Sequence, residues 1–290
     1  MNKITFLILC FSLMISSCEK EVVVETVTGN VAPDDETIED IIYSNYVQKL
    51  YISLLGRKPK DTELATDIVS LKVSSLSTES RNTLIAKVVA QEEYYDNEYN
   101  IMLADLLHNA DSAAFQESKY VYEFALTLTV TPLEIALITN ALEKLEPLIA
   151  LEGNLKSGSK SIKEAHEILV DNLIYDEINM GAENYVVSLF QNFLLRYPTT
   201  VELESGAGVY GGTPGILFNS SAKNKDELIL LFFNYAEYYE GQVRINYLRF
   251  LYREPTNDEI VLLAVQYQNT GDYKALQSYI LSLDEYTGLE

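Results

Sequence analysis

The chain has 290 residues, of which 48% are hydrophobic types, and a formal net charge of −22 from 43 acidic and 21 basic side chains. The hydrophobic content is enough for a large folded core and excludes an intrinsically disordered chain. The charge excludes nucleic acid as a partner and disfavours anionic lipid surfaces, because both would be repelled.

Residues 1–17 have the three-part order of a secretory signal peptide. Lys3 supplies a basic start, and residues 4–15 form an apolar segment that is shorter than the roughly 20 residues a membrane-spanning helix needs. The tetrad Ile15-Ser16-Ser17-Cys18 resembles the lipobox of bacterial lipoproteins, which implies cleavage before Cys18 and lipid attachment to its thiol. An ordinary signal peptide with a chance cysteine is the alternative.

Lipidation at Cys18 predicts stable attachment to the outer membrane, on its periplasmic or cell-surface face. The other cysteine, Cys10, lies in the removed segment, so disulfides, thiolate metal sites and cysteine nucleophiles are excluded from the mature domain. The only histidines are His108 and His166, and histidine is the commonest general base and metal ligand. We therefore expect no catalytic residues, no metal and no cofactor.

Residues 18–40 are predicted to be the lipidated N-terminus followed by an acidic flexible tether. Residues 19–40 carry eight acidic side chains against one basic side chain, Lys20, and lack helical periodicity. The run Val22-Val23-Val24 leaves open a second interpretation, in which this segment adds a strand to a partner's sheet.

An Arg-x-Pro-x-x-x-Glu motif occurs three times after the tether, each time behind apolar pairs at helical spacing. The three sets are Arg57, Pro59 and Glu63; Arg196, Pro198 and Glu202; and Arg253, Pro255 and Glu259. The pattern predicts an all-α fold of three or four imperfect helical repeats, in an N-terminal group (residues 41–180) and a C-terminal group (residues 181–290). Residues 120–138, which keep Thr131 and Glu134 but lack the Arg and Pro, are the candidate fourth copy.

Each motif indicates a helix boundary. The proline stops one helix, and a capping box starts the next at Thr199/Glu202 and Thr256/Glu259, whereas Lys60 is a weaker cap. The arginine is expected to bond the last carbonyls of the first helix or to pair with the glutamate that opens the second. A ligand-binding series of arginines is the alternative.

A further helix is predicted to close each repeat with a tyrosine-rich C-terminal end. These ends are Glu93-Tyr94-Tyr95, Glu237-Tyr238-Tyr239 and Glu285-Tyr286. We expect their rings to be buried and their hydroxyls to reach water. Another capping box, at Ser161 and Glu164, predicts a helix that runs to about Met180.

The run Leu50-Tyr51-x-x-Leu54-Leu55-Gly56-Arg57-x-Pro59, followed by Glu93-Tyr94-Tyr95, resembles a helical domain of unknown function from secreted bacterial repeat proteins. It is also faintly similar to the phycobilisome linker domain, which has a comparable LGR-x-P run and scaffolds other proteins. The resemblance covers residues 41–99 and, more weakly, residues 181–290. It implies interaction or assembly, and it brings no catalytic residue.

Residues 205–223 are predicted to be a long loop and the candidate binding site. The segment holds five of the 13 glycines and a literal G-x-G-x-x-G, but that match follows a helix and not the strand that dinucleotide binding requires. The candidate binding residues are Tyr210, Gly211, Gly212 and Phe218, with both aromatic rings expected to be exposed. A mobile connection without function is the alternative.

Together these features predict a membrane-anchored lipoprotein that acts as an interaction or scaffold module, with another envelope protein as its partner. The alternative is a surface glycan- or nutrient-binding lipoprotein accessory to an outer-membrane transporter. The 21 tyrosines favour this alternative and the absence of tryptophan disfavours it, because sugar-binding platforms favour tryptophan.

Overall fold

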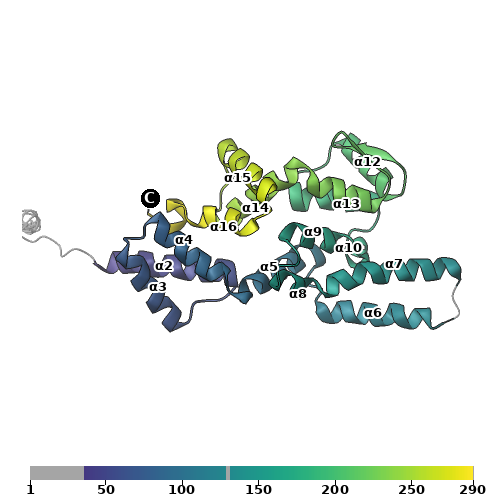
Figure 1. Cartoon of the computed structure of the whole chain (residues 1–290). Coiled ribbons are helices and arrows are strands. Elements are labelled where there is room, and N and C mark those ends of the chain that lie inside the picture. The colour runs from purple at the N-terminus through teal and green to yellow at the C-terminus, as the bar shows by residue number, and fades with distance from the viewer. Residues whose placement is uncertain (1–35, 129–130, 290) are drawn as a thin grey trace, which may run out of the picture. The chain divides into compact units, whose positions relative to one another are not determined.

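The computed structural model describes residues 36–128 and 131–289, and this part of the chain is almost entirely helical apart from one two-stranded hairpin (Figure 1). The predicted all-α fold is confirmed. The predicted signal peptide (residues 1–17) and lipidated Cys18 lie outside the described residues.

Helix α2 begins inside the segment that we predicted to be a tether. It spans Glu36–Leu55, so residues 36–40 are helical and the predicted boundary at residue 40 is wrong. Acidic residues favour the first turn of a helix because they face the positive end of its dipole. The acidic composition that indicated a tether therefore also suits a helix start.

From Thr37 onward the described residues pack as one compact unit with a continuous hydrophobic core. The first helices carry the first Arg-x-Pro motif: α2, α3 (Asp61–Val73), α4 (Thr78–Val89) and α5 (Glu92–Leu107). The middle of the chain follows: α6 (Ser112–Leu126), α7 (Pro132–Ile149), α8 (Leu151–Lys156), α9 (Ile162–Val170) and α10 (Leu173–Ile178).

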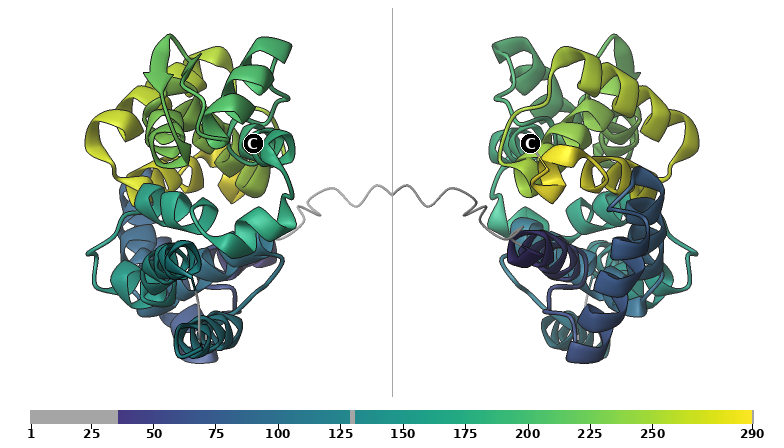
Figure 2. Two further views of the ribbon diagram at one scale, coloured as in Figure 1. Left: turned by 90° about the vertical axis from the view of Figure 1, so that its right-hand side faces the viewer. Right: turned by 90° about the vertical axis from the view of Figure 1, so that its left-hand side faces the viewer.

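The remaining elements carry the second and third motifs. They are α11 (Ala182–Leu189), the π-helix η1 (Phe190–Leu194), α12 (Thr200–Tyr210), β1 (Gly215–Leu217), β2 (Ser220–Ala222), α13 (Lys225–Asn234), α14 (Ala236–Leu251), α15 (Asn257–Thr270), α16 (Tyr273–Leu281) and α17 (Asp284–Thr287). Strands β1 and β2 pair antiparallel, with Ile216 opposite Ser221. In Figure 2 the helices of residues 41–180 and those of residues 181–290 lie largely in two stacked layers.

The predicted capping boxes are confirmed, but one predicted helix is broken. Ser161 accepts from the backbone N–H of Glu164 and starts α9. That helix ends at Val170 instead of running to Met180, because Asn172 donates to the carbonyls of Ile168 and Leu169 and then caps α10. A side chain that bonds the backbone on both sides competes with continued helix.

The tyrosine-rich segments begin helices and do not end them, so that prediction is wrong. Tyr94 lies in the first turn of α5 and Tyr238 in the first turn of α14, each just after a glutamate that favours a helix start. The expectation of wet hydroxyls is also wrong for Tyr94, which is fully buried and donates to Gln277 Oε1 at 2.8 Å.

The last helices pack directly against the first ones. Helices α4 and α16 are in contact, as Figure 1 shows. Tyr46 Oη of α2 donates to the carbonyl of Leu281 at 3.3 Å, and Arg81 of α4 forms a 2.6 Å ion pair with Asp284. The two ends of the folded unit therefore complete one core together.

Candidate functional site

The arginine of each Arg-x-Pro motif is bound by two glutamates. Arg196 Nη1 and Nη2 donate to both carboxylate oxygens of Glu202 at 2.9 and 2.8 Å. Its Nε and Nη2 donate to both oxygens of Glu237 at 2.5 and 2.8 Å. The remaining donor on Nη1 reaches the carbonyl of Tyr197 at 3.2 Å. All five N–H groups of this guanidinium are used.

The other two arginines have partners at the corresponding positions. Arg57 is bound by Glu63 and Glu93 and donates to the carbonyl of the residue that follows it. Arg253 is bound in the same way by Glu259 and Glu285. We call these three groups the arginine triads, and their donors are already taken, which favours a structural role over a ligand-binding one.

The triads also hold the pKa of their capping glutamates low. Hydrogen bonding from the arginine, with that from the backbone N–H at the helix start, lowers the pKa of Glu63, Glu202 and Glu259 to about 2.

The residue before each arginine has a left-handed backbone, at Gly56, Leu195 and Tyr252 with φ of 68°, 55° and 56°. Glycine adopts this geometry without strain, whereas leucine and tyrosine do not.

The predicted loop at residues 205–223 is instead a helix end and a β-hairpin. Gly206 lies inside α12, where an added Cβ would come within 3.0 Å of Val186 Cγ2, so this glycine allows α11 and α12 to pack closely. Gly211 and Gly212 are exposed beyond the helix, and Gly212 has a φ of 85°. These glycines therefore allow two helices to pack closely and a turn to adopt a positive φ, in addition to making the segment conformationally adaptable.

The two aromatic rings of that segment are half-buried, so the expectation of exposed rings is wrong. Tyr210 packs on Tyr185 with ring centroids 4.7 Å apart. Phe218 stacks on Tyr235 at 3.9 Å with the rings 2° from parallel. The structure gives the two rings different aromatic partners and does not bring them together into one site.

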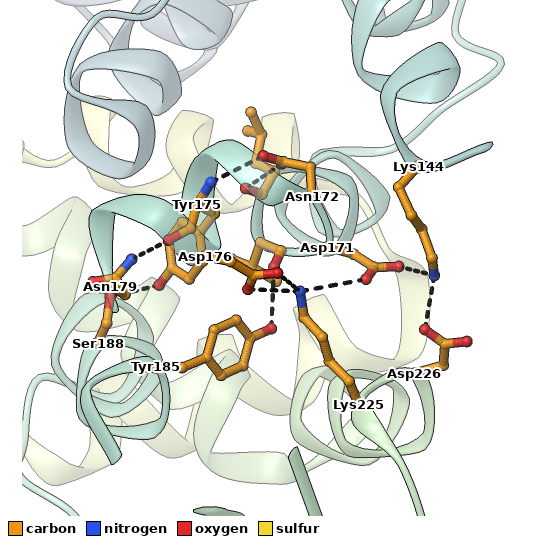
Figure 3. Close-up of polar contacts among 12 residues, drawn as sticks. Lys144, Asp171, Asn172, Tyr175, Asp176, Asn179, Tyr185, Ser188, Lys225 and Asp226 are labelled. Atoms are coloured by element: carbon orange, nitrogen blue, oxygen red, sulfur yellow. Dashed lines mark hydrogen bonds and ion pairs between the residues drawn. The ribbon is translucent and has the colours of Figure 1, made fainter. Parts of the chain in front are cut away.

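A lysine–aspartate network connects α7 with the start of α13 (Figure 3). Lys144 of α7 pairs with Asp171 and, at 2.7 Å, with Asp226. Lys225 of α13 pairs with Asp176 at 2.8 Å and lies 3.8 Å from Asp171. Asp171 therefore sits between two lysines from different layers, and the network joins α7 to α13.

A cleft lies between the two layers. Its inner recess has a volume of about 540 Å³ and is lined from α5, α9, η1, α14 and α16 by residues that include Ile101, Met102, Asp105, His166, Asn192, Phe193, Gln242, Ile245, Arg249 and Tyr273. An outer recess of about 340 Å³ is lined by residues that include Asp105, His108, Asn179, Asn184, Ser188, Gln191 and Asn192. Because Asp105, Gln191 and Asn192 line both recesses, we treat them as one central cleft.

The cleft owes its shape to a close backbone approach at one wall. A Cβ on Gly241 would lie 1.8 Å from the carbonyl oxygen of Phe193, so only glycine lets α14 cross η1 here. Single π-helical turns inside helices often occur at functional sites. Phe193 and Gln242, the residue after Gly241, both line the cleft.

The two histidines lie in different parts of the cleft. His166 is 7% exposed, its Nδ1 is 2.9 Å from Tyr238 Oη, and burial lowers its pKa to about 3, so it is neutral at physiological pH. His108 is the exposed left-handed residue that ends α5. Within the described residues no group of three or more His, Cys, Asp or Glu side chains is placed to hold a metal ion.

The charged groups of the cleft differ in how well they are paired. Glu98 is 3% exposed and is bound by Arg249 at 2.9 Å and by Gln277 Nε2 at 3.2 Å. Asp105, two turns further along α5, is exposed and has no hydrogen bond or ion pair to any described residue, and partial desolvation raises its pKa. Gln242 is 1% exposed, and its Nε2 also lacks a partner among them.

Sequence reasoning missed Asp105 and Gln242, although the sequence holds a faint signal for each. Asp105 is one of several acidic side chains in its helix, and it follows Glu98 by seven residues, which places these two on the same face. Gln242 stands where the other two motif segments have the buried Tyr46 and Tyr185. A polar residue at a position that is apolar elsewhere was the available clue.

Comparison with known proteins adds no relative: no family, curated protein or solved structure matches the chain. Among the described helices, none combines the length and the apolar character that crossing a membrane requires.

Proposed function

We propose that this chain is a membrane-anchored lipoprotein that acts as an interaction module within a cell-envelope assembly. The anchor rests on the lipobox-like Ile15-Ser16-Ser17-Cys18 behind an apolar segment. The interaction role rests mainly on the surface of α6, with support from the arginine triads.

The observation that carries the proposal is an apolar face on α6 that points away from the core. Tyr120, Val121 and Phe124 are each more than half exposed, at 68%, 53% and 54%. On a helix these positions lie within about 100° of one another, because each residue advances the chain by roughly 100°. Contiguous exposed apolar surface of this kind is typical of protein–protein contacts.

The triads support the view that the helices are copies of one repeat. All three arginines have the same two kinds of glutamate partner and follow a residue with the same left-handed backbone. Helix α14 would then serve two copies, because it begins with Tyr238 of the second and leads into Arg253 of the third. Residues 120–138 supply only the capping box of Thr131 and Glu134, which is weaker support for a fourth copy.

The cleft is the observation that favours the alternative, a glycan- or nutrient-binding lipoprotein. Its inner recess lies within the range of small-molecule sites. Its aromatic side chains, however, are buried, with Phe193 at 2% and Tyr273 at 8% exposure, so neither offers a sugar-stacking face as the cleft stands.

Co-purification of the native lipoprotein from detergent-solubilised membranes tests the proposal. We expect a stable protein companion whose recovery falls at least several-fold in Phe124→Ser. Val261→Ser is the matched control, because Val261 is equally exposed, at 62%, on α15. Both variants should melt within a few degrees of the wild type, since neither side chain is buried.

The same preparation also distinguishes the two functions. A protein that purifies alone and binds oligosaccharides would replace the proposed function with the alternative. Equal loss of the companion in Phe124→Ser and Val261→Ser would remove α6 as the contact surface.

A further inference from the structure

The central cleft contains acceptor groups that the fold itself leaves unused. Asp105 lies where the inner and outer recesses meet and has no hydrogen bond or ion pair to any described residue. Arg249 favours the charged form of Asp105 electrostatically but forms no hydrogen bond with it, because its donors bind Glu98 and the carbonyl of Ser53. A carboxylate in this position favours a cationic group in the cleft.

The asparagines around Asp105 add to this acceptor character. Asn179 Nδ2 donates to the carbonyl of Tyr175 at 2.9 Å, and Asn184 Nδ2 donates to the carbonyl of Met180 at 2.8 Å. Asn192 Nδ2 likewise donates to Ser188 Oγ at 3.1 Å.

In all three asparagines the amide nitrogen already donates within the protein, that of Asn192 to Tyr175 Oη as well, and no described residue donates to the side-chain oxygen. The outer recess therefore offers several oxygen acceptors and one negative charge, which suits a group with several N–H donors.

The inner recess has the opposite character. Ile101, Met102 and Ile245 provide an aliphatic lining beside the buried Phe193. Gln242 Nε2 is the one buried side-chain donor of this lining without a partner among the described residues, and a buried amide without a partner costs stability. A ligand that brings an aliphatic group and one carbonyl oxygen would satisfy both features.

We infer that the central cleft binds a basic, aliphatic peptide segment of a partner protein. A lysine or arginine side chain of that segment occupies the outer recess and donates to Asp105 and the asparagine oxygens. An adjacent aliphatic side chain fills the inner recess, and Gln242 Nε2 donates to a backbone carbonyl. The inference rests on the proposed function in one respect, namely that the ligand belongs to a protein.

The charge of the whole chain favours the same ligand. With a net charge of −22, the protein attracts basic segments over long distances and repels acidic ones. This general attraction must be separated from recognition at Asp105, so the test needs a control that removes an equal charge elsewhere. Asp258 of α15 provides it, because it is exposed and lies outside the cleft lining.

The test is calorimetric titration of the purified full-length lipoprotein, in detergent, with two short peptides. One is acetyl-Leu-Lys-Leu-amide, and the other replaces lysine with the uncharged norleucine. We expect the lysine peptide to bind about tenfold more tightly, as one charge-assisted contact in a partly desolvated site provides. Asp105→Asn should abolish this preference, whereas Asp258→Asn should leave it intact.

A second variant tests the inner recess. Gln242→Leu removes the unpaired donor at similar volume, so it should weaken both peptides equally while the melting temperature holds or rises. A merely structural glutamine would show no change in peptide affinity.

Several results would overturn the inference. These are equal affinity for the two peptides, the same loss in Asp105→Asn and Asp258→Asn, or no binding at millimolar peptide. Binding of n-hexylamine as tight as that of the lysine peptide would make the cleft a site for small amines and would overturn the peptide assignment.

Failure of this inference is separable from failure of the proposed function. If the lysine preference is absent but the companion still depends on Phe124, the inference falls and the proposed function stands. If the lysine preference depends on Asp105 but no companion is found, the cleft stands as a peptide site and the α6 contact falls.

Discussion

The arginine triads and the central cleft differ in how completely their polar groups are hydrogen-bonded. In the triads, every N–H donor of Arg196 has an acceptor, and the two glutamates that receive them are each bound through both oxygens. In the cleft, Asp105 and Gln242 Nε2 have no partner among the described residues. Gln242 is one of several buried polar side chains in the described part of the chain that lack a partner, but it is the only one of them that lines the cleft, where a ligand could pair with it.

The largest effect should come from the glycine that shapes the cleft wall. In Gly241→Ala the new methyl group would meet the Phe193 carbonyl oxygen at 1.8 Å, and neither a Cβ nor a backbone carbonyl can rotate away. We expect a loss of about 3 kcal/mol in unfolding free energy, measured by urea denaturation.

Gly153→Ala is the matched control for this change. Gly153 also lies in a helix, α8, but a methyl group added there would have nothing within 4 Å, so the alanine should be neutral or stabilise by about 0.5–1 kcal/mol. Equal stability of the two alanine variants would show that α14 and η1 do not hold this close approach.

A smaller effect is expected from the triads. Arg196→Met leaves Glu202 and Glu237 facing each other without their shared cation, which should cost about 1–3 kcal/mol, with solvent screening keeping the loss moderate. Arg244→Met is the control, because Arg244 forms only a long 3.5 Å pair with the exposed Glu254. Comparable losses in the two variants, again by urea denaturation, would contradict the structural weight we give to the triads.

The smallest effect is a change in the pH dependence of stability. The pKa of Glu202 is about 2 in the folded protein, against an ordinary value of 4.5, chiefly because Arg196 hydrogen-bonds its carboxylate. A lowered folded-state pKa contributes stability above pH 4.5 that is lost as the pH falls toward 2. Unfolding free energies measured between pH 7 and pH 3 should therefore fall less in Arg196→Met than in the wild type, and parallel profiles would argue against the linkage.

The sequence predicted the helical elements well because their signals are local. The capping boxes at Thr199 and Thr256 depend only on residues three apart, and apolar spacing marks the buried faces. Where neighbouring residues carry competing preferences, prediction failed. Asn172 divides a predicted helix by bonding backbone on both sides, and the glutamate before Tyr94 starts a helix where an end was expected.

The cleft was beyond local reasoning because its walls come from distant parts of the chain. Asp105 and Gln242 are 137 residues apart (242 − 105), and neither looks unusual within its own helix. The glycine-rich segment was predicted to be a binding loop because of its composition. In the structure Gly206 is needed because Val186 packs closely against it, and that contact is visible only in the folded chain. A high glycine content indicates an unusual backbone, but it does not identify the residues that pack against that backbone.

The contact between the first and last helices also governs when the chain can fold. The hydroxyl of Tyr46 donates to the carbonyl of Leu281, and the hydroxyl of Tyr94 donates to Gln277. The first helices therefore lack part of their core until the C-terminal helices are present. Until α16 and α17 have packed, this part of the core stays incomplete. During this interval the α2–α5 segment exposes apolar side chains, which can aggregate or bind a chaperone. A chain that lacks α16 and α17 would keep these apolar side chains exposed permanently.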